Sequence, residues 1–565
     1  MQKIIAILTY ESPFAPGGGI SAVMKYLPTY IKQASQLPTL VITPFHHNID
    51  RTASLLPAMQ LIGQMEILFE DKTLPVDVLL FEKEVTWIFL RPDDTRFFAG
   101  IHHPYDVIQD QDENHSHLLR DALIFGAASG KALSIIDSSA HWTLLLQDWE
   151  AAAAIFSLQQ LRQILKYEAY LTIHNTYDMH VSNIDLASLK LYSKKFPGET
   201  VLQRTIPFVK DPIFTVSNQF ASDLLEDPLQ TQVMAPHLLE YLSGRLLGVD
   251  NGLFTNLGID PVALSSARRG DFSLLEDWKM SKRRAAFNAL RQLSPSQENP
   301  LWGDIGKFKC DDSPWFIVAG RDDPRQKGFD LAYQAISTFL NEGLEACFLF
   351  FPIPGDEGLD GLRFLRTLAE KYPENVIVLP FLFQKGYLAA LQGATFGIMP
   401  SFYEPFGMAN EFYMNGVVGI GRATGGILQQ IIPLRSAAAY SEAVKTRTEK
   451  YYPPGTHPTG ILFRERDNIP SLIPDLKVIA SSEYKINEPE QDRITYRSTL
   501  RLFTEISREL YIGIKDAVHI YQSDPNQYYQ MLIQGIDYLH NTFSWERAAQ
   551  MYLRYIYPDE QKGDR

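Results

Sequence analysis

The chain has 565 residues, a length that predicts two large domains or about three to four domains of average size. Its 45% hydrophobic and 21% charged residues are ordinary for a globular protein and exclude the collagen-like and low-complexity classes. The net charge of −14, without a long basic run, argues against a nucleic-acid-binding surface. The two cysteines, Cys310 and Cys347, indicate a reducing compartment, and no apolar run is long enough for a membrane helix. We therefore expect a cytoplasmic protein with neither a nucleic-acid nor a membrane partner.

The first part of the chain alternates short apolar runs with helical segments. Continuous apolar runs predict buried strands at 4–10, 40–43, 142–147 and 170–173. A glycine-rich turn at 17–19 is followed by helical spacing of apolar residues over 20–34. Such alternation predicts right-handed βαβ units and a mostly parallel sheet.

The segment 293–314 interrupts this rhythm because it is polar and rich in proline and glycine, which is typical of an interdomain linker. The alternation then resumes, with strands expected at 315–319, 346–351, 375–379, 396–400 and 417–420. The predicted fold class is α/β, with two doubly wound domains at 1–292 and 315–540. The charged, helical region 464–538 is expected to decorate the second domain.

Ligands of open α/β sheets bind beyond the carboxyl ends of the strands, so the loops there hold the candidate residues. The first loop contains Gly18 and Gly19, whose bare backbone at the start of a helix suits an anion. The run 17–22 also fits the G-x-G-x-x-A pattern of dinucleotide-binding oxidoreductases. However, six residues separate the strand from the first glycine, and the second strand does not end on an acidic residue for a ribose. A glycine-rich turn without a ligand is the plain alternative.

Three further loops follow predicted strands of the second domain. Arg321 and Lys327 can direct two cations at one diphosphate; a solvated surface turn is the plain alternative, but the position directly after a predicted strand favours the functional interpretation. Glu404 lies on a rigid Pro/Gly turn and could bind sugar hydroxyls or simply cap a helix. The run Thr424, Gly425 and Gly426 precedes a helix whose first N–H groups suit a phosphate.

Two more candidates, Asp148 and His174, lie at strand ends of the first domain, and either could be an ordinary buried polar residue. The remaining histidines lack the spacing of a closed metal site, so no metal is predicted. Walker-A, G-x-S-x-G and paired CxxC motifs are absent from the sequence.

Taken in chain order, these pieces resemble the bacterial glycogen synthases and plant starch synthases, which are retaining glycosyltransferases with two facing Rossmann-like domains. In the first domain the matching pieces are Gly18-Gly19-Ile20, Gln147-Asp148-Trp149-Glu150, Thr172-Ile173-His174-Asn175, Thr215-Val216-Ser217 and Gly248-Val249-Asp250-Asn251-Gly252. In the second they are Arg321 with Lys327-Gly328, Pro400-Ser401 through Glu404-Pro405-Phe406-Gly407, Thr424-Gly425-Gly426, Thr459-Gly460-Ile461 and Phe543-Ser544-Trp545 with Ala548-Ala549.

The resemblance implies a GT-B architecture with an interdomain active-site cleft and a C-terminal helix, within 541–565, that returns to the first domain. It implies glucose transfer from ADP-glucose or UDP-glucose to the non-reducing end of an α-1,4-glucan, with the nucleotide sugar as substrate and without a cofactor or metal. The implied roles are diphosphate stabilisation by Arg321 and Lys327, glucose binding by Glu404, and phosphate or sugar binding by 424–426. His174 and Asp148 would line the sugar side, and Asn251 the cleft edge.

The sequence also departs from this family. The family's lysine two residues before Gly-Gly is Pro16 here, and the second glutamate of the Glu-x7-Glu pattern is replaced by Phe412, with Glu411 one place early. The alternatives are therefore a retaining glycosyltransferase with another donor or acceptor, and a non-catalytic glucan-binding relative. A dehydrogenase and a pyridoxal-phosphate-dependent phosphorylase fit the motifs less well.

Overall fold

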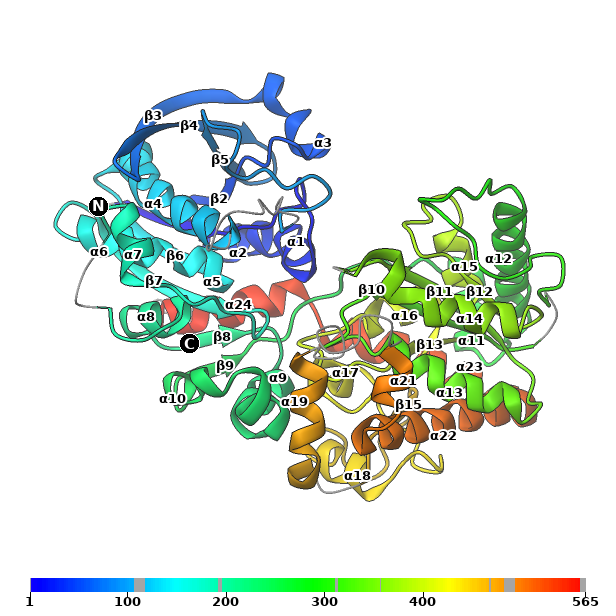
Figure 1. Ribbon diagram of the computed structural model, residues 1–565. Helices are drawn as coiled ribbons and strands as arrows, with labels where there is room; N and C mark the ends of the chain where they lie inside the picture. Colours follow the sequence, from blue (N-terminus) through cyan, green and yellow to red (C-terminus); the bar gives the residue numbers. More distant parts are fainter. Residues whose placement is uncertain are drawn as a thin grey trace. The chain divides into compact units, whose positions relative to one another are not determined.

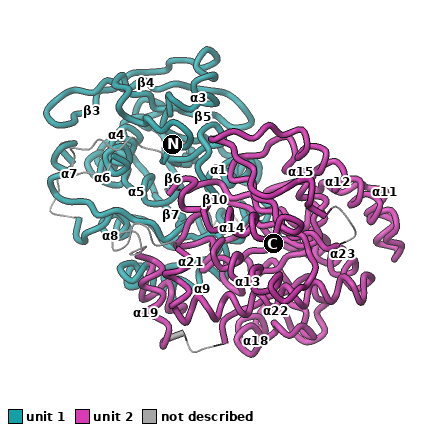
Figure 2. The backbone as a smooth tube through the Cα atoms, turned by 45° about the vertical axis from the view of Figure 1, so that its right-hand side comes forward, with its two compact units in different colours: residues 1–225, 235–252, 543–565 teal, residues 226–234, 253–542 magenta. Residues whose placement is uncertain are grey.

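The computed structural model describes residues 2–105, 117–191, 196–309, 313–355, 357–466, 469–481 and 493–558. The chain divides into two compact units, each described here by itself (Figure 2). Unit 1 comprises Met1–Leu225, Ala235–Gly252 and Phe543–Arg565. Unit 2 comprises Glu226–Met234 and Leu253–Thr542.

Unit 1 is built on a nine-stranded sheet in the order β3-β4-β5-β2-β1-β6-β7-β8-β9 (Figure 1). Its strands are β1 (Lys3–Leu8), β2 (Thr39–Pro44), β3 (Gln60–Phe69), β4 (Lys72–Glu82), β5 (Thr86–Pro92), β6 (His141–Gln147), β7 (Lys166–Ile173), β8 (Ile213–Thr215) and β9 (Leu246–Gly248). The strands from β5 to β9 in this order run parallel, which confirms the parallel sheet predicted from the continuous apolar runs.

The helices of unit 1 are α1 (Gly19–Met24), α2 (Leu27–Ser35), α3 (Asp50–Ala53), α4 (His117–Asp137), α5 (Asp148–Ala152), α6 (Ala154–Leu161), α7 (Asn183–Ser188), α8 (Val201–Thr205), α9 (Asn218–Glu226), α10 (Leu239–Leu242) and α24 (Trp545–Ile556). The single helix expected over 20–34 is in fact two helices. Pro28 occupies the first turn of α2, where its fixed φ and missing N–H favour the start of a new helix.

The sequence did not predict β3 and β4, which pair antiparallel and continue the sheet beyond β5. Their turn is formed by Glu70 and Asp71, both at positive φ (49° and 60°). Two-residue hairpin turns of this kind usually carry Asn-Gly or Asp-Gly, so the usual sequence signal is missing here.

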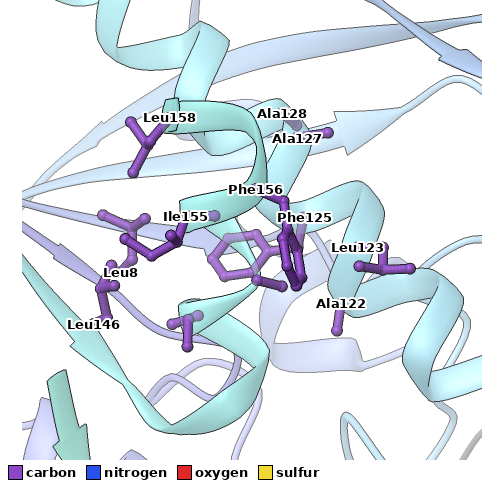
Figure 3. Packing of buried hydrophobic residues seen from close by; sticks show 14 of the residues in the cluster. Leu8, Ala122, Leu123, Phe125, Ala127, Ala128, Leu146, Ile155, Phe156 and Leu158 are labelled. Atoms are coloured by element: carbon purple, nitrogen blue, oxygen red, sulfur yellow. The ribbon is translucent and has the colours of Figure 1, made fainter. Parts of the chain in front are cut away.

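Alternate residues of the central strands pack on opposite faces of the unit 1 sheet. Leu8 of β1 and Leu146 of β6 face the core beneath α4 and α6, where Phe125 and Phe156 meet (Figure 3). Burying each of these phenylalanines contributes about 1.5–3 kcal/mol relative to exposure. At Gly126 a Cβ would come within 2.6 Å of the Ala153 backbone, so the close approach of this helix pair requires glycine.

The helix α24 belongs to unit 1 although it lies at the far end of the chain. Trp545 stacks on Tyr26 of unit 1 with ring centroids 5.6 Å apart. Tyr552 packs on Phe214 of β8 at 4.5 Å, and the hydroxyls of Tyr557 and Thr143 are 2.7 Å apart. The helix α24 therefore completes the core of unit 1, whose other parts come from the first half of the chain.

Unit 2 contains a six-stranded, fully parallel sheet in the order β12-β11-β10-β13-β14-β15. Its strands are β10 (Trp315–Arg321), β11 (Cys347–Ile353), β12 (Val376–Val378), β13 (Phe396–Met399), β14 (Val418–Arg422) and β15 (Ile461–Phe463). Its helices are α11 (Pro261–Arg268), α12 (Ser273–Arg291), α13 (Phe329–Asn341), α14 (Arg363–Lys371), α15 (Tyr387–Gly393), α16 (Ala409–Met414), α17 (Gly425–Gln430), α18 (Glu442–Thr448), α19 (Ile473–Ser481), α21 (Arg493–Arg497), α22 (Arg501–Ser523) and α23 (Pro525–Thr542).

The division at 292 and the linker at 293–314 differ from the observed units, which place residues from 253 onward in unit 2. The reason is packing: the buried Lys279 of α12 donates to the carbonyls of Ala394 and Gly416, both at 2.5 Å. Within the expected linker, Trp302 exchanges backbone hydrogen bonds with Val378, the last residue of β12. Residues 310–312 of that segment, with Cys310, lie outside the described residues.

In the described parts of the chain, no helix combines the length and the apolar character needed to cross a membrane.

Candidate active site

The candidate residues of unit 2 follow three neighbouring strands of its sheet. The strands β10, β13 and β14 are adjacent and parallel, so the loops that follow them start at the same edge. Arg321 is the last residue of β10, while Lys327, Glu404 and Thr424 come after β10, β13 and β14 respectively. This is the edge at which open α/β sheets bind ligands.

The structure brings Lys327 and Glu404 together, although 77 positions separate them in the sequence. The Lys327 ammonium donates to Glu404 Oε2 at 2.6 Å, and the Ser401 hydroxyl donates to the same oxygen at 3.0 Å. The lysine side chain remains 28% exposed and the glutamate 11%. An ion pair held in this way is fixed in place and still accessible to a ligand.

The loops that carry these two residues are interlocked through their backbones. The Phe402 N–H donates to the Gln326 carbonyl at 2.8 Å. Gly328 has φ +66°, and a Cβ there would come within 2.6 Å of the Pro400 carbonyl oxygen. Arg321, partly exposed, follows Gly320 at φ +134°.

Glu411, which lies one place too early for the second glutamate of the Glu-x7-Glu pattern, has its carboxyl in the electrostatic field of Lys327. Burial raises the pKa of Glu411 to about 7, and the Lys327 charge acts in the opposite direction. Glu411 lies in the first turn of α16, the helix that follows β13. Its position in the helix after a strand-end loop is the signal that could have identified it.

The turn Thr424-Gly425-Gly426 packs directly on the backbone of Glu404. Gly425 has φ +44°, and a Cβ there would meet the Glu404 carbonyl oxygen at 1.8 Å. The Gly426 N–H donates to this same oxygen at 3.1 Å. The glycines therefore allow the Glu404 loop to pack closely against this turn. The Gly426 N–H, which the sequence suggested as a hydrogen-bond donor to a phosphate, already donates a hydrogen bond within the protein.

Beneath this turn lies a buried set of charges. Arg422 donates to both carboxylate oxygens of Glu465, at 2.9 and 2.6 Å, and also to the Phe402 carbonyl. Arg464 donates to the Ala423 carbonyl at 2.5 Å and to Asp227 at 2.9 Å. These bonds hold the strand-end loops from below.

In unit 1 the structure brings Asp148 and His174 together at the ends of β6 and β7. The backbone N–H of His174 donates to Asp148 Oδ1 at 2.6 Å, and Asp148 has a positive φ of 60°. Burial raises the pKa of Asp148 and lowers that of His174 to about 3. The imidazole is therefore neutral near pH 7, with Nε2 2.8 Å from Gln147 Oε1.

A second acidic residue, Glu150, lies two residues further along α5. Its pKa is raised well above the usual value by burial, and the nearby Asp148 carboxyl raises it further. One of its oxygens is buried without a hydrogen-bond partner among the described residues. The sugar-side candidates thus lie among carboxyl groups that resist ionisation.

The glycine turn of unit 1 is occupied by the protein's own carboxylate. Glu11 Oε2 accepts the N–H groups of Gly17, Gly18 and Ser21 at 3.1, 2.6 and 3.2 Å. The Tyr105 hydroxyl donates to Glu11 Oε1 at 2.9 Å. An anion does bind at this helix start, as the turn suggested, but it is supplied by Glu11 within the structure. The bonds span six to ten residues, and nothing in the motif itself identifies the glutamate.

The remaining candidates of unit 1 are the exposed Gly19 and the buried Asn251. Gly19 is exposed, and a Cβ there would have no heavy atom within 4 Å. Asn251 is buried after β9, and its N–H donates to the Val216 carbonyl at 3.2 Å. Across the described ranges, no three His, Cys, Asp or Glu side chains are grouped so that they could hold a metal ion.

Known glycogen and starch synthases are similar to this chain. Residues 4–236 match the starch synthase catalytic domain family. The chain is 24% identical over 451 residues to the glycogen synthase of Thermosipho melanesiensis, covering 76% of this chain and 84% of the relative. It is 23% identical over 541 residues to a probable glycogen synthase of Methanocaldococcus jannaschii, covering 86% and 88%.

Two solved structures share its fold. The catalytic domain of starch synthase IV from Arabidopsis thaliana, bound to ADP and acarbose, superposes with a TM-score of 0.67 at 17% identity over 98% of both chains. A sucrose-phosphate synthase from Thermosynechococcus elongatus gives a TM-score of 0.52 at 15% identity over both full chains. Both support the GT-B architecture of glycosyltransferases. The chain is thus similar to glycogen and starch synthases over most of its length, and it is a glycosyltransferase.

Proposed function

We propose that this protein transfers glucose from ADP-glucose or UDP-glucose to the non-reducing end of an α-1,4-glucan, with retention of configuration. The observation that carries the proposal is the Lys327–Glu404 pair, held over the Thr424–Gly426 turn at the strand ends of unit 2. The bond from glucose C1 to the diphosphate oxygen breaks, a glucan hydroxyl oxygen bonds to C1 in its place, and the hydroxyl proton passes to the departing diphosphate.

The departing diphosphate carries the charge that this reaction must stabilise. Arg321 and Lys327 are assigned to it, since positioned cations act where charge develops in the transition state. Two side-chain cations would make a metal unnecessary, and no cofactor is proposed. Glu404, held by Lys327 and Ser401, is assigned to the hydroxyls of the donor glucose.

Sugar binding in unit 1 is assigned to the neutral His174 and to Asp148, with Asn251 as a further contact. A neutral imidazole can donate one hydrogen bond and accept another, which suits a sugar hydroxyl. The starch synthase IV structure, which is bound to ADP and acarbose, supports a nucleotide-sugar donor and a glucan acceptor.

A different donor or acceptor on the same fold is the second candidate, and Pro16 and Glu11 favour it. Pro16 stands where the family has a lysine that contacts the donor. The Glu11 carboxylate accepts hydrogen bonds from the N–H groups of Gly17 and Gly18. Donor recognition is then assigned mainly to unit 2, which leaves the choice between ADP and UDP to the loops there.

The test is a matrix of donors and acceptors with purified protein. ADP-glucose and UDP-glucose are each supplied with and without glycogen, and release of nucleoside diphosphate is recorded. Glycogen-dependent release from one donor supports the proposal, and the Arg321→Ala/Lys327→Ala double variant should abolish it. Glycogen binding without release from either donor would instead identify a non-catalytic glucan-binding protein.

A further inference from the structure

Two buried arginines on α21 contact the loop that carries the proposed diphosphate residues. Arg493 and Arg497 are four positions apart, so they project from the same face of the helix. Their side chains are only 2% and 1% exposed. Neither belongs to a motif that the sequence analysis singled out.

Arg493 holds the start of this loop. Its two terminal nitrogens donate to the two oxygens of Asp322 at 3.0 and 2.9 Å, a bidentate pair. One of them also donates to Glu357 at 3.1 Å, and the guanidinium lies 5.3 Å from the centre of the Phe364 ring. Asp322 directly follows Arg321, so this pair fixes the backbone next to that residue.

Arg497 holds the other end. It donates to Asp330 at 2.6 Å, in the first turn of α13, and to the Pro324 carbonyl at 2.7 Å inside the loop. Its guanidinium lies 5.8 Å from the ring centre of Phe402, on the neighbouring loop of Glu404.

Buried ion pairs of this kind are poor sources of stability, because removing the charges from water costs about as much as their attraction returns. What they do provide is directional geometry, which is bidentate at Arg493 and shared between Asp330 and the Pro324 carbonyl at Arg497. Here two of them bracket residues 322–330, with Lys327 between them and Arg321 directly before them. Positioning of catalytic groups is sensitive, since a shift of about 1 Å can cost about a hundredfold in rate.

We propose that Arg493 and Arg497 are positioning residues that set Arg321 and Lys327 for the diphosphate of the nucleotide sugar. The inference rests on the proposed function of that loop. It gives a role to α21, which lies within the charged, helical region 464–538.

The test uses Arg493→Lys and Arg497→Lys in the full chain. Lysine keeps the positive charge beside each buried carboxylate but lacks the planar fork, so the protein should stay folded while the loop is held less precisely. The matched control is Arg283→Lys, also buried in unit 2, where Arg283 bonds to Gly393, Ser313 and Thr395 instead.

Each variant is measured for kcat, for KM of the glucan, for ADP and UDP affinity by calorimetry, and for amide hydrogen exchange of residues 321–328. The two α21 variants should lower kcat about tenfold or more, leave the glucan KM unchanged and speed exchange in the loop, whereas the control should change none of these. In an Arg321→Ala background, Arg493→Lys should cost little more, because both changes disable the same group.

The proposal is overturned if the α21 variants match the control in kcat and loop exchange, or if their cost is fully additive with Arg321→Ala. A wild-type protein that turns over no donor would refute the proposed function. The positioning role of Arg493 and Arg497 would then be tested separately, by amide exchange of residues 321–328 and by the affinity for ADP and UDP. Unchanged exchange and affinity in the α21 variants would refute it.

Discussion

Lys327 serves two partners in the proposed reaction, since it pairs with Glu404 in the free protein and is assigned to the diphosphate when the donor binds. The pair is partly exposed, so its attraction is moderated by water and can be redistributed when a ligand arrives. The Ser401 hydroxyl also donates to Glu404 Oε2, so this bond does not depend on Lys327. In the proposed reaction it would keep the carboxylate in place while Lys327 binds the donor.

Arg321→Ala and Lys327→Ala should each lower kcat about a hundredfold or more, because each removes a positioned donor to the leaving diphosphate. Thermal melts should move by little, since neither side chain is fully buried. Lys445→Ala is the control, because Lys445 pairs with Glu442 on the surface of α18. A near-normal kcat in either variant would show that this loop is only a surface turn.

Glu411 predicts a pH dependence of stability. Its pKa is about 7 in the folded protein, well above the usual value, so the folded state resists losing this proton. Between the two pKa values the unfolded chain releases the proton first, and this group therefore costs stability as the pH rises.

Glu411→Gln should be as stable as wild type near about pH 4.5 and more stable by about 1–2 kcal/mol near about pH 8.5. The gain is smaller than the full shift implies because the side chain is partly exposed. Urea titrations at the two pH values measure it. Equal stability at both would place the Glu411 pKa at its ordinary value.

Sequence reasoning located Lys327 and Glu404 because each follows a strongly apolar strand, and strand ends are where such folds bind ligands. It could not show that they pair, since that depends on the order β10-β13 in the sheet. It missed Glu11 for another reason. A glycine-rich helix start predicts an anion, but the pattern does not say whether the anion is a ligand or a neighbouring carboxylate.

At the scale of elements, the parallel strands were predictable because burial on both faces demands continuous apolar runs. The strands β1, β6 and β10 confirm this. The strands β3 and β4 were missed because both carry exposed residues, such as Leu61 and Leu68 of β3, and their turn lacks glycine. The contacts of α21 could not be predicted either. Arginines are usually exposed, and the aspartates that pair with these two lie 171 and 167 positions away in the sequence.

The glycine turn before α17 gives a prediction at this scale. Gly425→Ala should destabilise unit 2 by about 1–3 kcal/mol or more and displace Glu404, because the new methyl meets the Glu404 carbonyl oxygen and φ is positive. Gly19→Ala, at a helix start with open space, should change stability by less than about 0.5 kcal/mol. Chemical denaturation measures the free energy of unfolding of both variants. Equal losses in Gly425→Ala and Gly19→Ala would mean that this turn does not hold the Glu404 loop.

At the scale of the whole molecule, unit 1 is assembled from both ends of the chain. Trp545 and Tyr552 of α24 are 4% and 2% exposed against residues of unit 1. Each buried aromatic contributes about 1.5–3 kcal/mol, so the C-terminal segment is a large part of the stability of the unit that it completes.

Truncation after Thr542 should therefore destabilise unit 1 and leave unit 2 protected in hydrogen exchange. Trp545→Ala should reproduce part of the effect, whereas Tyr555→Ala should not, because Tyr555 is 39% exposed on the same helix. Loss of protection in unit 2 with unit 1 intact would contradict the assignment of α24.

The most direct test of the account is the extension of a maltooligosaccharide labelled at its reducing end, with each nucleotide sugar in turn. The account predicts a ladder of single-glucose additions at the unlabelled end, joined by α-1,4 linkages, with one of the two donors. The ladder should disappear in the Arg321→Ala/Lys327→Ala double variant. An unchanged oligosaccharide with both donors, in a protein shown to be folded, would contradict the account.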